Sequence, residues 1–186
     1  MNTLKNILEF NKIFVEKKDY EKYTSSNLPN KKAVIVSCMD TRLTELLPKA
    51  MNVRNGDVKI VKNAGATIIH PFGSAVRSIL VAIYEFDAKD IFIIGHHGCG
   101  MSNIEPTHII EEMRARGISD DTLNTLKNAG IDLNTWLKGF TCVKESVLES
   151  VNVVKNHPLM PKTVRIHGLI IDPETGKLDL VIDGTK

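Results

Sequence analysis

Short apolar runs alternate along this chain with longer stretches in which apolar residues recur at helical spacing. The runs are typical of buried strands, because they are brief and rich in valine and isoleucine; they span residues 33–37, 57–61, 90–94, 163–171 and 178–182. The periodic stretches predict helices at residues 43–50, 72–86, 104–113, 119–128 and 143–156. Strands that alternate with helices indicate right-handed crossovers and a mainly parallel sheet.

The two ends of the chain add to this pattern. Residues 4–23 predict an amphipathic helix, and residues 25–30 read as a connector. The short turn at residues 172–176 implies that the last strand runs antiparallel. We therefore predict one α/β domain over residues 1–186. Its central sheet has about five strands, mainly parallel with the last antiparallel, flanked by helices. Residues 1–30 form a helical arm, whose apolar face must be buried on its own domain or on a partner subunit.

Composition narrows the class of protein. The 186 residues are 42% hydrophobic and 25% charged, as in an ordinary globular domain. The net charge of +2 argues against nucleic-acid or membrane partners. The first residues lack the apolar core of a signal peptide, and no apolar run is long enough to span a bilayer. We therefore expect a cytoplasmic location. The three cysteines make no disulfide framework.

Two cysteines and a histidine come directly after two predicted strands. Cys38 follows the run at 33–37, while His96 and Cys99 follow the run at 90–94. In an open α/β sheet, ligand chemistry gathers at the edge where parallel strands end. Two thiolates and an imidazole form a ligand set suited to Zn²⁺, and three protein ligands leave a fourth position open, as in catalytic sites. The sequence therefore predicts one Zn²⁺ per chain.

Other interpretations of the cysteines stay open at this point. Free cysteines are often small buried hydrophobic residues. A closed structural zinc site would need a fourth protein ligand, from Asp40 or Cys142. Cys142 has no histidine or aspartate beside it, and we interpret it as structural. A thiol redox protein is disfavoured, because the chain has no Cys-x-x-Cys pair.

Asp40 and Arg42 follow Cys38 at a spacing that allows a bidentate guanidinium–carboxylate pair. The simpler interpretation is a surface ion pair that contributes little to the stability of the fold. In a catalytic site, Asp40 would accept the hydrogen bond of a zinc-bound hydroxide, and Arg42 would keep the carboxylate ionised and oriented. If Arg42 released it, the same carboxylate could bind the zinc in an inactive form favoured at lower pH. We assign Asp40 and Arg42 as catalytic.

Weaker candidates surround this core set. Small residues in Asn63-Ala64-Gly65-Ala66 would let backbone amides approach a ligand, although a simple turn explains them equally well. Three histidines are candidate proton carriers because imidazole titrates near neutral pH, with ordinary loop histidines as the alternative; they are His70, His97 and His108. His97 is not expected to share an ion with His96, because adjacent side chains in extended backbone diverge.

Taken together, these motifs resemble the β-class carbonic anhydrases. The resemblance rests on Cys38-x-Asp40-x-Arg42, Lys62-Asn63-Ala64-Gly65, His96-x-x-Cys99-Gly100 and the final segment His167-Gly168-Leu169-Ile170-Ile171-Asp172 with Thr175-Gly176-Lys177-Leu178. It covers the chain from about residue 32 onward and is similar to the compact prokaryotic branch. His97-Gly98 stands where relatives in that branch often have Thr-Asp, and the plant-type glutamine near the substrate is not evident.

The resemblance implies that Cys38, His96 and Cys99 bind zinc, that Asp40 and Arg42 form the catalytic dyad, and that the chain is a homodimer or a higher assembly. In such a dimer the interface lines the active-site cleft, and the N-terminal helices pack on the neighbour. The expected activity is reversible hydration of carbon dioxide to bicarbonate and a proton by zinc-bound hydroxide. Carbon dioxide is apolar, and the expected walls of its pocket are the loop after the first predicted strand together with Asn63, Ala64, Gly65, Ile68, Ile69 and Phe72. The alternatives are a hydrolase of carbonyl sulfide or carbon disulfide on the same scaffold, and a closed structural-zinc binding module.

Overall fold

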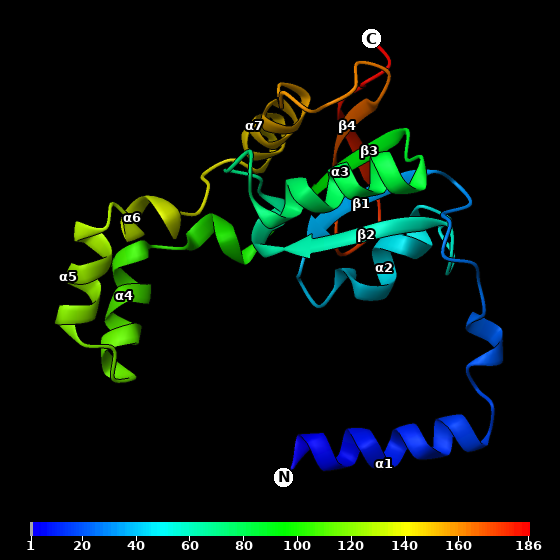
Figure 1. The fold of residues 1–186 in the computed structure, drawn as a ribbon, viewed down its shortest axis with the longest axis horizontal. Helices are drawn as coiled ribbons and strands as arrows, with labels where there is room; N and C mark the ends of the chain where they lie inside the picture. The colour runs from blue at the N-terminus through cyan, green and yellow to red at the C-terminus, as the bar shows by residue number, and fades with distance from the viewer. Residues whose placement is uncertain (1) are drawn as a thin grey trace.

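A five-stranded sheet is the centre of the computed structural model, which describes residues 2–186 (Figure 1). The strands lie in the order β2-β1-β3-β4-β5. Their bounds are Ala33–Cys38 for β1, Val58–Asn63 for β2, Asp90–His96 for β3, Arg165–Ile171 for β4 and Leu178–Ile182 for β5. The first four pair in parallel, and β5 pairs antiparallel with β4. The predicted α/β fold, with its mainly parallel sheet and antiparallel last strand, is confirmed.

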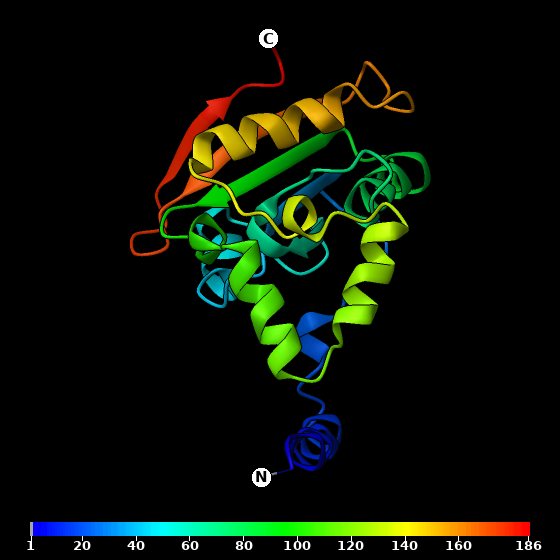
Figure 2. The same ribbon diagram turned by 90° about the vertical axis from the view of Figure 1, so that its left-hand side faces the viewer.

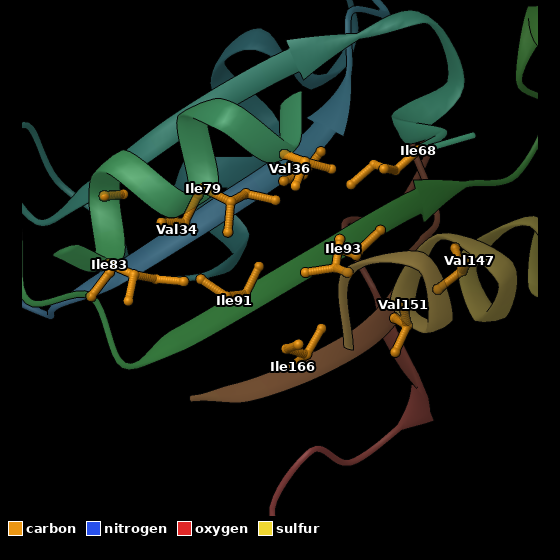
Figure 3. Close-up of a cluster of buried hydrophobic side chains, with 14 of the residues drawn as sticks. Val34, Val36, Ile68, Ile79, Ile83, Ile91, Ile93, Val147, Val151 and Ile166 are labelled. Atoms are coloured by element: carbon orange, nitrogen blue, oxygen red, sulfur yellow. The ribbon is translucent and has the colours of Figure 1, made fainter. Parts of the chain in front are cut away.

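Helices cover both faces of this sheet. On one face lie α3 (Ser74–Phe86) and α7 (Val143–Lys155), and on the other lies α2 (Leu43–Ala50). Strand β1 is buried on both sides, which explains its continuous apolar sequence. Figure 3 shows the larger core cluster, where side chains of α3 and α7 meet those of the sheet, among them Val34, Val36, Ile79, Ile91, Ile93, Val147, Val151 and Ile166.

Two glycines on neighbouring strands bring α7 close to the sheet. A Cβ atom at Gly168 in β4 would lie 2.8 Å from Cγ1 of Val147, and one at Gly95 in β3 would lie 2.8 Å from Cγ2 of Val147 and of Val143. Real Cβ atoms do not approach neighbours this closely, so any side chain at either position would push α7 away. The glycine of His167-Gly168 is therefore required by packing.

Three helices form an excursion between β3 and α7. They are α4 (Pro106–Ala115), α5 (Asp120–Asn128) and α6 (Leu133–Trp136), and Figures 1 and 2 show them extending away from the sheet. Pro106 occupies the first turn of α4, where its missing N–H costs nothing, so the helix predicted from residue 104 begins two residues later. Helix α6 was not predicted, because four residues are too few to show a period.

The N-terminal helix α1 spans Thr3–Glu16. The prediction of a helix over residues 4–23 is therefore wrong at its C-terminal end. Lys18 takes a left-handed conformation, with φ of 57°. The Asp19 N–H then donates to the Phe14 carbonyl, and the Lys18 N–H donates to the Val15 carbonyl, both at 3.0 Å. This is the Schellman ending, which glycine usually marks. A lysine there gives no signal in the sequence, and only a short 3₁₀ turn, Glu21–Tyr23, follows.

Helix α3 also begins later than the helix predicted over residues 72–86. Gly73 is its N-terminal capping residue, and the Gly73 N–H donates to the His70 carbonyl at 3.1 Å. Phe72 therefore lies in a turn rather than in the helix.

Helix α1 stands apart from the body of the protein (Figures 1 and 2). None of its residues is buried, and its apolar side chains, including Leu4, Ile7 and Phe10, are exposed. The interpretation that this face packs on its own domain is thus not supported by the described residues. Within residues 2–186, no helix combines the length and the apolar character needed to cross a membrane.

The close contact of α7 with the sheet predicts that Gly168→Ala destabilises the protein. Overpacking at this point should lower the free energy of unfolding by about 1–3 kcal/mol, measured by denaturant titration. Combining it with Val147→Ala should cost less than the sum of the two single changes, because the smaller residue removes the contact with Val147, although the contact with Ile182 Cγ2 at 2.9 Å remains. Gly100→Ala is the control, since a Cβ there meets no atom within 4 Å. Equal losses for both glycine variants would contradict this account.

Candidate metal centre

Three metal-binding side chains converge at one edge of the sheet. Strands β1 and β3 are parallel neighbours that pair Ser37 with Ile94, so both end at the same edge. Cys38 is the last residue of β1, His96 is the last of β3, and Cys99 lies in the loop that follows. All three side chains are buried, with their donor atoms within 4.8 Å of one another and the two sulfur atoms 3.8 Å apart.

His96 is held in the form that a metal needs. Its Nδ1 lies 3.0 Å from the His97 carbonyl oxygen, so the Nδ1–H donates there and Nε2 keeps its lone pair. Within residues 2–186, Nε2 is buried and finds no hydrogen-bond partner. Burial lowers the pKa of His96, which favours the neutral ring. A buried acceptor with no partner is costly unless a ligand satisfies it, and a cation fits this position.

The two thiols need a cation in the same place. Burial, together with the nearby Cys38, raises the pKa of the Cys99 thiol to about 11. The Gly65 N–H donates to the Cys38 sulfur at 3.3 Å, which stabilises charge on that atom. Gly65 reaches it with a positive φ of 75°, a conformation that glycine adopts without strain. Two sulfur atoms and one imidazole nitrogen form a soft donor set that fits zinc and leaves one position for a non-protein ligand.

Asp40 and Arg42 form an ion pair beside these donors. The Arg42 Nε–H donates to Asp40 Oδ1 at 3.0 Å, and Nη2–H donates to Oδ2 at 2.9 Å. The backbone N–H of Arg42 adds a third bond to Oδ1 at 2.9 Å. Asp40 Oδ2 lies 3.7 Å from His96 Nε2, so the carboxylate borders the space that a metal would fill. The hydrogen bond from Arg42 lowers the pKa of Asp40 to about 2, and the group stays ionised at neutral pH.

The ion pair is anchored to the metal-binding loop as well. Arg42 Nη2–H donates to the Gly98 carbonyl at 3.1 Å. Gly98 turns the chain between His96 and Cys99 with a φ of 61°. A single guanidinium thus ties the loop after β1 to the loop after β3.

A pocket of about 320 Å³ opens onto the two sulfur atoms. Ala64 and Gly65 line it, and so does Met39 in the loop after β1, which the sequence analysis also named as a wall. The sequence interpretation missed two further apolar walls, Met101 and Ile104. Their only signal is position, since each lies close in sequence to a cysteine of the donor set. The pocket is small and mostly apolar, which suits a small neutral molecule.

Other predicted pocket residues lie elsewhere. The Asn63 side-chain N–H donates to the Thr67 carbonyl at 2.9 Å, which closes the turn below the pocket. Ile68 points into the core between α3 and α7 (Figure 3). Phe72 is exposed and packs edge-on against His157, with the two ring centroids 5.0 Å apart. Ile69 is also exposed. The structure therefore does not bring Ile68, Ile69 or Phe72 to the donor cluster.

The three candidate proton carriers are all exposed. His97 directly follows the metal-site histidine, and its N–H donates to the Ile171 carbonyl at 3.1 Å. His70 Nδ1 accepts from the Phe72 N–H at 3.1 Å. His108 belongs to α4, in the excursion. Their role in proton transfer stays a prediction.

Cys142 is separate from the donor set. It caps the N-terminus of α7 and lines a different pocket with Trp136 and Glu145. Among residues 2–186, only Cys38, His96 and Cys99 form a group of three or more potential metal ligands. A closed site completed by Cys142 is therefore not supported.

The parallel sheet, the Cys-His-Cys donors and the adjoining Asp–Arg pair together define the β-class carbonic anhydrase type of site. The chain belongs to the carbonic anhydrase family, since the family model described as "Carbonic anhydrase" matches residues 33–178. It is accordingly an enzyme of that family.

Individual relatives agree with this assignment. The chain is 60% identical over 184 residues to "Putative carbonic anhydrase YvdA" of Bacillus subtilis, which covers 99% of this chain and 93% of that protein. It is 34% identical over 159 residues to a carbon disulfide hydrolase of Acidithiobacillus thiooxidans, covering 80% and 76% of the two chains. A crystal structure of a β-carbonic anhydrase from Trichomonas vaginalis superposes with a TM-score of 0.87 at 33% identity, covering 99% of this chain and 100% of that one.

The donor set predicts which changes remove metal. Cys99→Ser should lose most of the bound zinc, because an alcohol is a far weaker ligand than a thiolate. Cys142→Ser is the matched control and should keep the zinc content of the unaltered protein, measured by elemental analysis. Loss of zinc from both variants would contradict the three-donor site.

Metal affinity should also depend on pH in a defined direction. With a pKa of about 11, the Cys99 thiol is protonated at neutral pH without metal, and binding must displace that proton. The apparent zinc affinity should therefore rise about tenfold per pH unit for each proton displaced. Competition against a chelator between about pH 6.5 and about pH 8.5 measures this slope. A flat profile would contradict the raised pKa of the Cys99 thiol.

Proposed function

We propose that this protein catalyses the reversible hydration of carbon dioxide to bicarbonate and a proton, with one zinc ion held by Cys38, His96 and Cys99. The observation that carries the proposal is the Asp40–Arg42 pair, fixed 3.7 Å from the unpartnered His96 Nε2. In a closed structural site Asp40 would be the fourth ligand, whereas here Arg42 binds both of its carboxylate oxygens. When bound, zinc would lower the pKa of a water molecule so that hydroxide is available near neutral pH.

Asp40 has a defined task in this reaction. Its Oδ2 borders the donors and can accept a hydrogen bond from the attacking oxygen, which turns a lone pair of that oxygen toward the carbon of the substrate. Because Asp40 stays ionised down to a pH of about 2, it accepts rather than donates this bond throughout the neutral range. Arg42 fixes both carboxylate oxygens and neutralises their charge.

The pocket suits the substrate. Carbon dioxide has no charge to anchor, and walls made by Met39, Ala64, Met101 and Ile104 offer an apolar surface beside the donors. The product is an anion and is released from a site whose two thiolates already balance the charge of a divalent cation. One hydroxide adds to one carbon dioxide, and a new water restores the site by releasing its proton to solvent.

Asp40→Asn tests the proposal. The amide keeps the size of the side chain but loses the charge and one acceptor, so kcat/KM for carbon dioxide hydration should fall by about tenfold or more. Stopped-flow measurement at about pH 8.5, above the pKa expected for water on a neutral site, follows the rate. Zinc content should remain at one per chain.

Asp179→Asn is the control for this experiment, because Asp179 lies on β5 and pairs with Lys177 at 2.8 Å, outside the donor set and the Asp40–Arg42 pair. An unaltered protein with zinc bound and a rate no better than buffer would overturn the proposed function.

A second function is favoured by one comparison. The 34% identity to a carbon disulfide hydrolase makes hydrolysis of carbon disulfide or carbonyl sulfide the alternative reaction on the same residues. The donors do not distinguish these linear molecules. Rates with each of the three gases, measured on one preparation of known zinc content, decide between them.

We also infer that the active species is a homodimer in which α1 packs on the neighbouring subunit. The support is the row of apolar side chains on α1, which includes Leu8 and Phe10 and is exposed in the single chain. Phe10→Asp should convert a dimer into a monomer in light scattering, because a charge cannot be buried there cheaply. Lys5→Asp, on the same helix but paired only with Glu9, should leave the mass unchanged.

A further inference from the structure

The outer edge of the Arg42 guanidinium faces an acidic side chain that has no role in the proposed reaction described so far. Arg42 Nη1 lies 3.7 Å from Glu174 Oε1. The nitrogen atoms Nε and Nη2 are taken by Asp40 and Gly98, so Glu174 approaches from the remaining side. Glu174 therefore complements the Asp40 pair and does not compete for the same N–H groups.

Glu174 belongs to a turn that is itself well fixed. It lies between β4 and β5, where the Asp172 carboxylate accepts from the Glu174 N–H at 2.8 Å and from the Thr175 hydroxyl at 2.9 Å. The Asp172 N–H donates to the Lys177 carbonyl at 2.9 Å and closes the turn. These bonds set the backbone position of Glu174, and the ion pair with Arg42 directs its side chain.

The same turn packs on the helix that Arg42 begins. Arg42 is the N-terminal capping residue of α2, and a Cβ at Gly176 would lie 3.3 Å from Leu46 and 3.6 Å from Ala50 of that helix. On its other side, the end of β4 accepts the His97 N–H through the Ile171 carbonyl. The turn is therefore fixed relative both to Arg42 and to the metal-binding loop.

We propose that Glu174 is a positioning residue, which holds the outer edge of Arg42 so that the guanidinium keeps Asp40 in its catalytic orientation. This inference rests on the proposed function. Without Glu174, Arg42 loses one of its three anchors. Asp40, whose Oδ2 lies only 3.7 Å from His96 Nε2, would then be freer to turn toward the three donors and to bind the metal that they would hold.

The expected effect is on geometry and not on stability. The side chains of Arg42 and Glu174 are 41% and 79% exposed, and ion pairs in such surroundings contribute little to folding. We expect Glu174→Gln to lower kcat/KM about two- to fivefold, because the interaction free energy of an exposed ion pair is small. Glu174→Lys repels Arg42 and should lower kcat/KM about tenfold. KM should stay unchanged, because carbon dioxide does not touch Glu174.

The experiment uses the full chain loaded with zinc for kinetics and with Co²⁺ for spectroscopy. Absorption of the Co²⁺ protein reports the ligands, and a chelator reports the rate of metal release. If Asp40 moves onto the metal in Glu174→Lys, the spectrum changes and release slows. Adding Asp40→Asn to this variant should then restore the spectrum of the Asp40→Asn single variant. Asp179→Asn, on the same hairpin, is the control and should match the unaltered protein in every readout.

Unchanged Co²⁺ spectra together with kcat/KM within twofold for both Glu174 variants would overturn the inference. A spectral change that persists in the double variant with Asp40→Asn would also overturn it, because Asp40 would not be the group that moves. If the unaltered protein does not hydrate carbon dioxide, the proposed function fails. The spectra and the release rates still decide whether Glu174 controls Asp40.

Discussion

The parallel pairing of β1 with β3 is the constraint on which the site depends. It places Ser37 opposite Ile94, so that Cys38, one residue further along β1, and His96, two residues further along β3, deliver a thiol and an imidazole to one edge. A register shift of one residue would reverse the side chains of a strand and separate the donors. The register is itself set by the core, because Val34 and Val36 must face α3 while Ile35 faces α2. The chemistry of the site is in this way a consequence of the same packing that stabilises the sheet.

The charge of the Cys-His-Cys donor set explains why the adjoining Asp40–Arg42 pair matters to the proposed reaction. Two thiolates balance a divalent cation, and a neutral site acidifies water less than one built from neutral imidazoles. In the proposed reaction the ionised Asp40, fixed by Arg42, would supply the orientation that the metal charge does not. Gly98 contributes only a carbonyl to this arrangement, so the His97-Gly98 segment, which departs from the usual Thr-Asp, keeps the anchor through its backbone.

Sequence patterns predicted the helices and strands in which apolar residues recur at a regular spacing. They failed where the backbone conformation or a segment distant in sequence determines the end of a helix or the direction of a side chain. The strands and the convergence of Cys38 with His96 follow from short apolar runs and parallel connectivity. The end of α1 depends on a lysine in a conformation usually taken by glycine. Two pocket walls also escaped prediction, because the direction of the chain after Cys99 decides that Met101 faces the donors, and the turn at Ala64–Ala66 decides that Ile68 enters the core instead. Spacing alone carries no information on that direction.

The excursion formed by α4, α5 and α6 contains the single tryptophan of the chain, Trp136. This indole lies outside the sheet and is 62% exposed, in the short helix α6 from which the chain returns to α7. Its fluorescence therefore monitors the excursion, whereas circular dichroism monitors the whole backbone. If the excursion unfolds before the sheet, the two signals will give different transition midpoints. A melting curve followed by fluorescence alone will then underestimate the stability of the sheet that carries the donors.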